Sequence, residues 1–414
     1  MADNNSIPNK GWQVTFAGMG INLALGILYT WSVISKSIPA DWGWNESDKS
    51  WPYSVACLVF CLIMVPAGRM QDKLGPRVVA AAGGILVGIG FILAGFTTSL
   101  LGFVIGFGVF AGAGIGFGYA SCTPPAVKWF PAAKTGLIAG IVVSGFGLAS
   151  VYAAPLTKFL VATYGFTSTM IILGVAFMVV VVGLSFLLIP PPKDFVHTSD
   201  TASAAKKTAS GKKYDYSATE MLKTPQFYII WFMYACGAGA GLMIISKLAA
   251  IASTQVGISL GFVLVAVLAI GNGGGRVLAG MMSDKFGRKA TMFTCFVFQA
   301  ILIFLISKAH TGNFLGSMVI MAVISALIGA NYGSNLALFP SITKDFFGLK
   351  NFGINYGLVF TAWGVGGFLL AKLAGSMYVK YQTFDIAYYG ASSLLILAAL
   401  TTLMVKPPKS QSAN

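Results

Sequence analysis

A single arginine lies deep in an otherwise apolar stretch of this sequence. Arg276 comes eight residues before Asp284, which belongs to the polar turn that follows the stretch. In a helix, this spacing places Arg276 roughly 12 Å from the turn. Moving an arginine into apolar surroundings costs roughly 2.5–3.5 kcal/mol on membrane-insertion scales, and the stretch contains no acid to pair with it. Because a guanidinium binds a carboxylate through two parallel hydrogen bonds, we interpret Arg276 as an anion site. The alternative is an arginine satisfied by backbone carbonyls and water.

Four other polar residues are candidates for the same chemistry. Asn272 lies one helical turn before Arg276, on the same helix face, and its amide could bind a hydroxyl or carbonyl oxygen. Tyr119 and Tyr332 begin matching Tyr-x-Ser segments 213 positions apart. Either hydroxyl could reach a carboxylate, and core packing is an equally good explanation. Lys372 lies in another apolar stretch. One interpretation is that its ammonium reaches the membrane surface; the alternative is that it attracts anions or carries a proton.

The composition indicates which elements hold these residues. Of 414 residues, 56% are hydrophobic and only 9% are charged, whereas a soluble domain carries about 25% charged residues. A helix needs about 20 apolar residues to cross a bilayer. The sequence therefore predicts an all-α membrane protein with twelve transmembrane helices. The predicted spans are residues 13–36, 52–69, 78–98, 100–126, 136–160, 167–189, 226–250, 257–282, 289–308, 313–340, 353–378 and 386–405.

The placement of charges predicts the organisation of the chain. A polar linker at 191–224 separates an N-terminal six-helix half, 1–190, from a C-terminal half, 225–414, and residues 214–223 fit a short surface helix. Most of the 27 Lys and Arg residues fall on the side that holds this linker and both termini. The positive-inside rule places that side in the cytoplasm. We expect a multi-pass protein of the plasma (inner) membrane, whose net charge of +15 needs no nucleic acid to explain it.

Two polar turns resemble each other, at 68–77 and 280–289. Each has a glycine followed four residues later by an aspartate, then by a second glycine and basic residues, and the two aspartates lie 212 positions apart. Glycine permits the tight turn, and the aspartate can cap a helix or pair with an arginine. We predict two pseudo-symmetric halves and a gate that closes one cytoplasmic state, with a solvated turn as the alternative. The predicted gate residues are Gly68, Asp72, Arg77, Gly280, Asp284 and Arg288.

This repeated turn resembles the signature of the major facilitator superfamily. Other segments resemble, more narrowly, the oxalate/formate antiporter group and its monocarboxylate-transporter relatives. These segments are Thr224–Phe227, Asn272–Arg276, Asn351–Gly357 and Thr361–Gly364. The resemblance covers most of the chain and implies alternating access by two six-helix halves. It also implies that Arg276 binds the substrate carboxylate; the repeat places Met64 at the matching position of the first half, so the arginine is not part of the shared scaffold.

At three places this chain differs from the families that it resembles. Each difference limits the substrate or the coupling mechanism that the resemblance implies. Proton-coupled animal relatives carry an aspartate where this chain has Asn272, which puts an aspartate-based proton step in doubt. Oxalate-type exchangers carry a second cation where this chain has Trp363, and one central cation matches one substrate charge. Leu28 and Tyr29 fall near a lysine of the animal carriers, and Leu28 could contact a substrate methyl group.

We therefore expect a secondary transporter of a small monocarboxylate, such as L-lactate or pyruvate, that works as a monomer by proton symport. An organic anion antiporter of oxalate/formate type and a carboxylate receptor that does not transport remain alternatives. The sequence contains no Ser/His/Asp set and no nucleotide motif, and its five cysteines lack metal-ligand spacing with a histidine. We accordingly expect no enzymatic activity, no cofactor and no metal.

Overall fold

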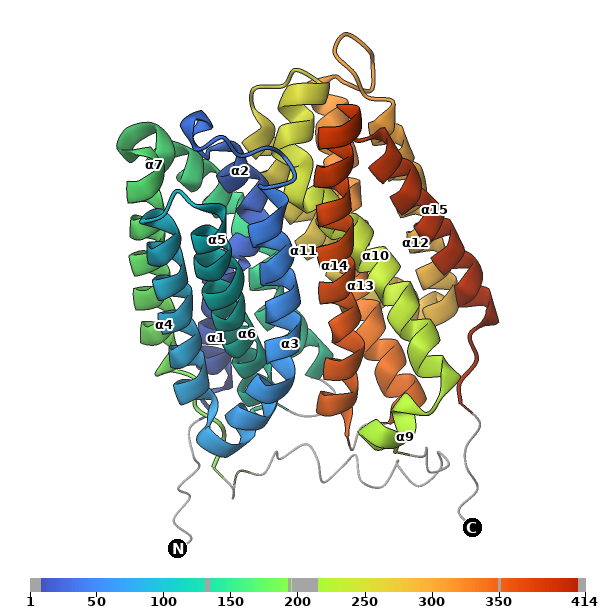
Figure 1. Cartoon of the computed structure of the whole chain (residues 1–414). Helices are drawn as coiled ribbons and strands as arrows, with labels where there is room; N and C mark the ends of the chain where they lie inside the picture. The colour runs from blue at the N-terminus through green and yellow to red at the C-terminus, as the bar shows by residue number, and fades with distance from the viewer. Residues whose placement is uncertain (1–8, 131–134, 193–194, 196–214, 349–350, 409–414) are drawn as a thin grey trace, which may run out of the picture.

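The computed structural model describes residues 9–130, 135–192, 195, 215–348 and 351–408, and over these ranges it is helical, without strands. The first-half helices are α1 (Gly11–Leu25), η1 (Gly26–Thr30), α2 (Trp31–Lys36), η2 (Ala40–Trp42), α3 (Ser50–Leu74), α4 (Pro76–Gly95), α5 (Leu100–Phe103), η3 (Val104–Ala111), α6 (Gly112–Val127) and α7 (Thr135–Ser185). The second-half helices are α10 (Pro225–Ala250), η6 (Ile251–Gln255), α11 (Gly261–Phe286), α12 (Arg288–Ser307), α13 (Met318–Phe347), α14 (Phe352–Tyr381) and α15 (Asp385–Met404). The two sets lie side by side in Figure 1.

The helices account for the twelve predicted membrane crossings. Eleven helical segments of the described chain are long and apolar enough to span a bilayer. One of them, α7, has 51 residues and is interrupted at Gly165, where φ is 77°. A straight helix of that length would measure about 75 Å, more than twice the roughly 30 Å of a hydrocarbon core. The left-handed backbone at Gly165 turns the chain, so α7 crosses twice and the predicted fold class is confirmed.

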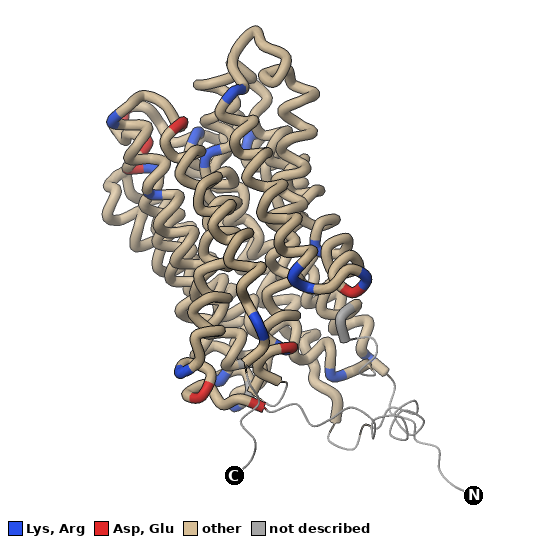
Figure 2. The backbone as a smooth tube through the Cα atoms, turned by 90° about the vertical axis from the view of Figure 1, so that its right-hand side faces the viewer, with Lys and Arg blue, Asp and Glu red and all other residues tan. Residues whose placement is uncertain are grey.

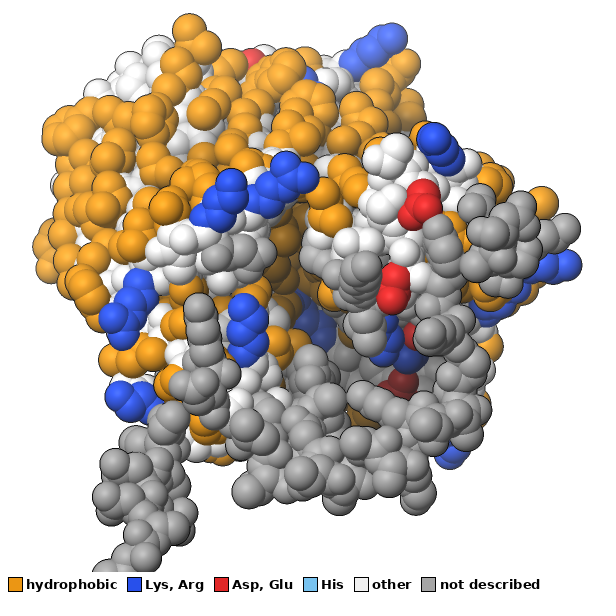
Figure 3. Space-filling view, turned by 90° about the horizontal axis from the view of Figure 1, so that it is seen from below, with side chains coloured by type: hydrophobic (Ala, Val, Ile, Leu, Met, Phe, Trp, Pro, Cys, Tyr) orange, Lys and Arg blue, Asp and Glu red, His pale blue; other side chains and the backbone are white. Residues whose placement is uncertain are grey.

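The surface of the bundle fits a lipid environment. Figure 2 shows most charged residues toward the two ends of the helices, with long uncharged stretches between them. Hydrophobic side chains cover the flanks in the end-on view of Figure 3. This distribution follows from the lipid surroundings, because placing a charged side chain against hydrocarbon costs free energy.

The two predicted turns have the same backbone geometry. Gly75 ends α3 with φ 87° and ψ 157°, and Gly287 ends α11 with φ 86° and ψ 155°. A side chain would strain this conformation, so glycine is required at both places. The second glycines of the repeated turn thus occupy equivalent places in two halves that are built alike.

The halves meet mainly through two helix pairs. Helix α7 packs on α11, α3 packs on α14, and the short α2 also reaches α10. Seen from the end that carries the termini, the molecule is hollowed between the halves (Figure 3). Polar contacts join the halves at the opposite end, as described below. The conformation is thus closed at the end far from the termini.

A short helix, α9 (Ala218–Leu222), lies within the range where a surface helix was predicted. Ser217 caps it by accepting from the amide of Glu220, and the Glu220 carboxylate accepts from the amide of Ser217. This reciprocal capping explains why so few residues form a helix. Residues 193–194 and 196–214 of the proposed linker lie outside the described chain.

Candidate functional site

Arg276 is buried on α11, with 6% of its surface exposed. Its Nε donates to Oδ1 of Asn272 at 3.2 Å, and its Nη1 donates to the backbone carbonyl of Val143 on α7 at 2.8 Å. The arginine therefore touches both halves. Its Nη2 and the Nδ2 of Asn272 are both buried without a hydrogen-bond acceptor among the described residues. Two buried donors on neighbouring turns of α11 are thus left without an acceptor in hydrogen-bonding geometry.

A glycine makes room for this arginine. Gly147 lies one helical turn after Val143 on α7, and a Cβ at this position would lie 3.2–3.3 Å from Nη2, Cζ and Nε of Arg276. Contacts this short force a neighbour to move. The guanidinium therefore rests against bare backbone, an arrangement that depends on two halves that are remote in sequence.

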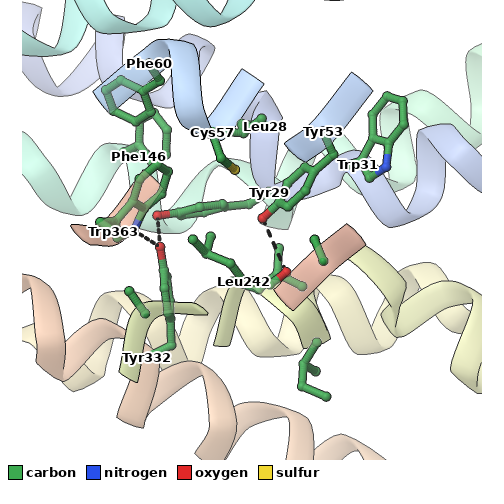
Figure 4. Close-up of a cluster of buried hydrophobic side chains, with 14 of the residues drawn as sticks. Leu28, Tyr29, Trp31, Tyr53, Cys57, Phe60, Phe146, Leu242, Tyr332 and Trp363 are labelled. Atoms are coloured by element: carbon green, nitrogen blue, oxygen red, sulfur yellow. Dashed lines mark hydrogen bonds between the residues drawn. The ribbon is translucent and has the colours of Figure 1, made fainter. Parts of the chain in front are cut away.

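The predicted tyrosines have different surroundings. The hydroxyls of Tyr29 on η1 and Tyr332 on α13 lie 2.5 Å apart, and Nε1 of Trp363 donates to the Tyr332 hydroxyl at 2.7 Å. Figure 4 shows this chain of three side chains, which joins the halves. Tyr119 on α6 is only partly buried, and its hydroxyl interacts with Arg276 through charge and as a side-chain hydrogen-bond partner, although not closely enough to satisfy Nη2. Tyr119 thus faces the arginine, whereas the hydroxyl of Tyr332 is already bonded by protein.

Aromatic rings from both halves pack together beside these residues. Phe60 lies 5.4 Å from Tyr119 and 5.1 Å from Trp363, measured between ring centroids. Phe146, which precedes Gly147, lies 5.4 Å from Tyr119. Phe360 stacks on Trp363 at 5.2 Å. These five residues form what we call the aromatic cluster. Phe60, Phe146 and Phe360 could not be predicted as site residues, because an aromatic residue in an apolar span has the pattern of ordinary packing.

Leu28 and Lys372 lie outside the aromatic cluster. Leu28 is fully buried. Lys372 on α14 donates to the backbone carbonyl of Ser47 at 3.1 Å and to its hydroxyl at 2.7 Å. Its ammonium also lies 4.1 Å from the ring centroid of Trp51. Lys372 therefore connects the second half to the first at the closed end.

An ion pair accompanies this contact. Lys247 is almost fully buried on α10, and its ammonium bonds the Glu46 carboxylate of the first half at 3.1 Å. Lys49 lies 3.5 Å from the same carboxylate. Burial alone would raise the pKa of Glu46, but the attraction of Lys247 and Lys49 holds it below its ordinary value of 4.5. This pair could not be predicted from the sequence, because Glu46 belongs to a loop that is 201 residues away from Lys247.

The predicted gate residues lie at the other end. Arg288 bonds Asp284 at 2.7 Å and Asp345 at 3.1 Å, and all three belong to the second half. Gly280 lies near the end of α11, Gly68 lies at the matching place in α3, and Arg77 lies in the first turn of α4. The side chain of Asp72 lies outside the described part of the structure. Among the described ion pairs, only the one between Glu46 and Lys247 joins the two halves.

Comparison with known proteins agrees with this architecture. A sequence model of the Major Facilitator Superfamily matches residues 14–270 and 245–414. The chain belongs to the major facilitator superfamily. Like other members of this superfamily it is a multi-pass membrane transporter. The relatives in the superfamily include transporters of organic anions.

Two relatives in the superfamily match nearly the whole chain. The oxalate:formate antiporter of Oxalobacter formigenes is 27% identical over 96% of this chain and 92% of its own. Monocarboxylate transporter 13 of Rattus norvegicus is 22% identical over 93% of this chain and 86% of its own.

A third relative and a solved structure also match. An uncharacterised MFS-type transporter of Escherichia coli (strain K12) is 28% identical over 86% of this chain and 85% of its own. Among solved structures, a bacterial homologue of the human lysosomal transporter Spinster aligns over 97% of this chain and 96% of its own, with a TM-score of 0.62 and 14% identity. At that identity, the structural match shows the shared fold alone.

Proposed function

We propose that this transporter carries a small monocarboxylate such as L-lactate or pyruvate. The observation that carries the proposal is the pair of unfilled donors, Nη2 of Arg276 and Nδ2 of Asn272. Leaving a buried donor without an acceptor costs about 1–3 kcal/mol, and more for a charged group. A carboxylate would fill both donors and neutralise the arginine, so the two oxygens of one acid match the site.

The surroundings of Arg276 favour one charge on the substrate. The position at which oxalate-type exchangers carry a second cation is Trp363, which is buried and donates to Tyr332. A second carboxylate would lose its water without gaining a partner, which is costly. The aromatic cluster offers apolar contacts to a short carbon skeleton instead.

The two ends of the molecule support transport by alternating access. Contacts of Glu46 with Lys247 and of Ser47 with Lys372 join the halves at the closed end. Figure 3 shows the hollow at the end with the termini. We assign that end to the cytoplasm of a plasma-membrane protein by the positive-inside rule, and the Asp72 and Asp284 turns to the gate there.

We propose that the coupling ion is a proton. Among the described residues, no Asp or Glu forms an ion pair with Arg276, so we assign the proton to the substrate carboxyl group or to Lys372. The lysine is suited to this role because its ammonium holds the closed end together through Ser47. Loss of its proton would weaken that contact.

Uptake into proteoliposomes tests the proposed function. We expect purified protein to accumulate labelled L-lactate, faster at about pH 6 outside than at about pH 8. Unlabelled pyruvate should compete, and oxalate should compete poorly. Strong competition by oxalate and none by pyruvate would overturn the monocarboxylate assignment. A saturable binding signal without any uptake would favour the receptor alternative.

Anion exchange is a second candidate, favoured by the near full-length match to the oxalate:formate antiporter. Counterflow separates it from symport. If the protein is an exchanger, vesicles loaded with unlabelled substrate will take up labelled substrate, and empty vesicles with an imposed pH gradient will take up none. Symport predicts uptake in both.

A further inference from the structure

A cavity of about 280 Å³ lies between the halves, at the closed end. Its size is close to the lower end of the roughly 300–1,000 Å³ typical of small-molecule sites. The first half contributes residues of α2 and α7, and the second half contributes residues of α10, the segment before α11, and α11 itself. None of the lining residues belongs to the Arg276 site or to the aromatic cluster, so this is a separate place in the molecule.

Two lysines give the cavity a positive charge. Lys36 ends α2 and Lys158 lies on α7, and both line the cavity. The Lys36 ammonium donates to the hydroxyl of Ser253, and the Lys158 ammonium lies 4.8 Å from the ring centroid of Phe262. Neither lysine takes part in an ion pair among the described residues, and the nearby Glu46 is bonded to Lys247 and Lys49. Two cations that have no ion-pair partner among the described residues thus face one space.

The rest of the lining is mostly apolar. Val33, Val161, Ala162 and Phe262 contribute to the walls. Beside it, Phe159 of α7 exposes 61% of its side chain and Leu260 exposes 47%. These residues continue the hydrophobic flank of the bundle. A hydrated inorganic ion would gain little from such walls, whereas an amphiphile could place its charge on the lysines and its chain on the flank.

We propose that the cavity lined by Lys36 and Lys158 binds the headgroup of an anionic phospholipid, with an acyl chain along α7. Basic pockets between transmembrane helices bind anionic lipid headgroups on the cytoplasmic side of membranes, and the same charge complementarity applies at this end. Lys36 is the last residue of α2, and Lys158 lies seven residues before the break of α7 at Gly165, roughly 10 Å along the helix. A lysine side chain is long enough to carry its ammonium from there toward the headgroup level. The phosphate is bound by the two ammonium groups, and Ser37 and Ser259 line the same space.

The location gives this lipid a conformational effect. The cavity walls come from both halves, so a headgroup held there connects them. Opening this end would separate the walls and dismantle the site. The lipid therefore binds the closed form better and shifts the population toward it.

Native mass spectrometry of the full-length protein tests the site. Protein would be titrated with phosphatidylglycerol or phosphatidylcholine, as wild type and as Lys36→Gln/Lys158→Gln. A matched control, Lys223→Gln/Lys406→Gln, removes the same charge at the end with the termini. We expect one phosphatidylglycerol to bind more tightly than phosphatidylcholine, and the Lys36/Lys158 variant to lose about tenfold or more of that affinity. The control should bind as wild type does.

Three outcomes would overturn the proposal. They are equal binding of the two lipids, equal binding by wild type and the Lys36/Lys158 variant, and displacement of phosphatidylglycerol by inorganic phosphate at similar concentration. The last outcome would assign the cavity to a free anion. If the double variant does not fold, Lys158→Gln alone replaces it. In the wild type, the Lys158 ammonium contacts only the Phe262 ring among the described partners, so its loss should disturb folding little. Lipid binding is measured without transport, so failure here leaves the proposed substrate untouched.

Discussion

The Glu46 carboxylate and the Lys247 ammonium, 3.1 Å apart, join the loop before α3 to the buried face of α10. Lys247 is 2% exposed, so its charge has little water to stabilise it. Replacing Glu46 by Gln should open this end, because losing a charged hydrogen bond costs about 1.5–3 kcal/mol. Cysteine-labelling rates at the closed end should rise. Asp41→Asn, in the same loop, is the matched control; equal labelling of both variants would contradict a role for the pair.

The same pair predicts a pH dependence. The pKa of Glu46 is lowered in the folded protein, so its stabilising effect is complete above its ordinary value of 4.5 and is lost as the pH falls through the lower, folded value. The difference in unfolding temperature between wild type and Glu46→Gln should be full at about pH 7 and shrink below about pH 4. Thermal unfolding in detergent across this range measures it. A difference that grows on acidification would show that another group is responsible.

Substrate binding should be sensitive to a single methyl group added at Gly147. In Gly147→Ala the new Cβ would crowd the Arg276 guanidinium at 3.2–3.3 Å. We expect KM for the carboxylate to rise about tenfold, since overpacking costs about 1–3 kcal/mol. Gly147→Val should raise KM further. Gly140→Ala is the control on the same helix, because a Cβ there meets nothing within 4 Å. An unchanged KM in Gly147→Ala would mean that Arg276 does not depend on this contact.

The Tyr332 hydroxyl should stabilise the contact between the halves. Tyr332→Phe removes the partner of both Tyr29 and Trp363. Each group left unsatisfied costs about 1–3 kcal/mol, so the unfolding temperature should fall. In a double-mutant cycle with Tyr29→Phe, the combined loss should be smaller than the sum of the two single losses. Strict additivity would indicate that the two hydroxyls are not coupled.

Local features of the sequence predicted the fold well. Each apolar run of spanning length became a helix, since a bilayer leaves the backbone few alternatives. Arg276 and Asn272 are four residues apart on one helix, and their side chains bond as that spacing requires. The two glycine turns, at Gly75 and Gly287, could likewise be matched by position alone.

Contacts between the halves could not be predicted in this way. The Val143 carbonyl that accepts from Arg276 is 133 residues away, and no sequence pattern marks a backbone oxygen. The apolar runs around Phe60 and Phe146 predict burial but not which rings meet. The pairing of Glu46 with Lys247 depends on how a loop folds over another helix. Such contacts depend on how two separately patterned halves dock.

The most direct test of the central claim is carboxylate uptake by Arg276→Lys in proteoliposomes. Lysine keeps the charge but loses the planar fork that offers Nη2 to a carboxylate while Nε and Nη1 hold Asn272 and Val143. Lys223→Arg, at an exposed position outside the site and the gate, makes the reverse exchange of the same two side chains. If Arg276 binds the substrate carboxylate, kcat/KM for L-lactate should fall about 10- to 100-fold in Arg276→Lys, the loss of one charged hydrogen bond, and stay at the wild-type value in Lys223→Arg. Wild-type uptake by a correctly folded Arg276→Lys would contradict it.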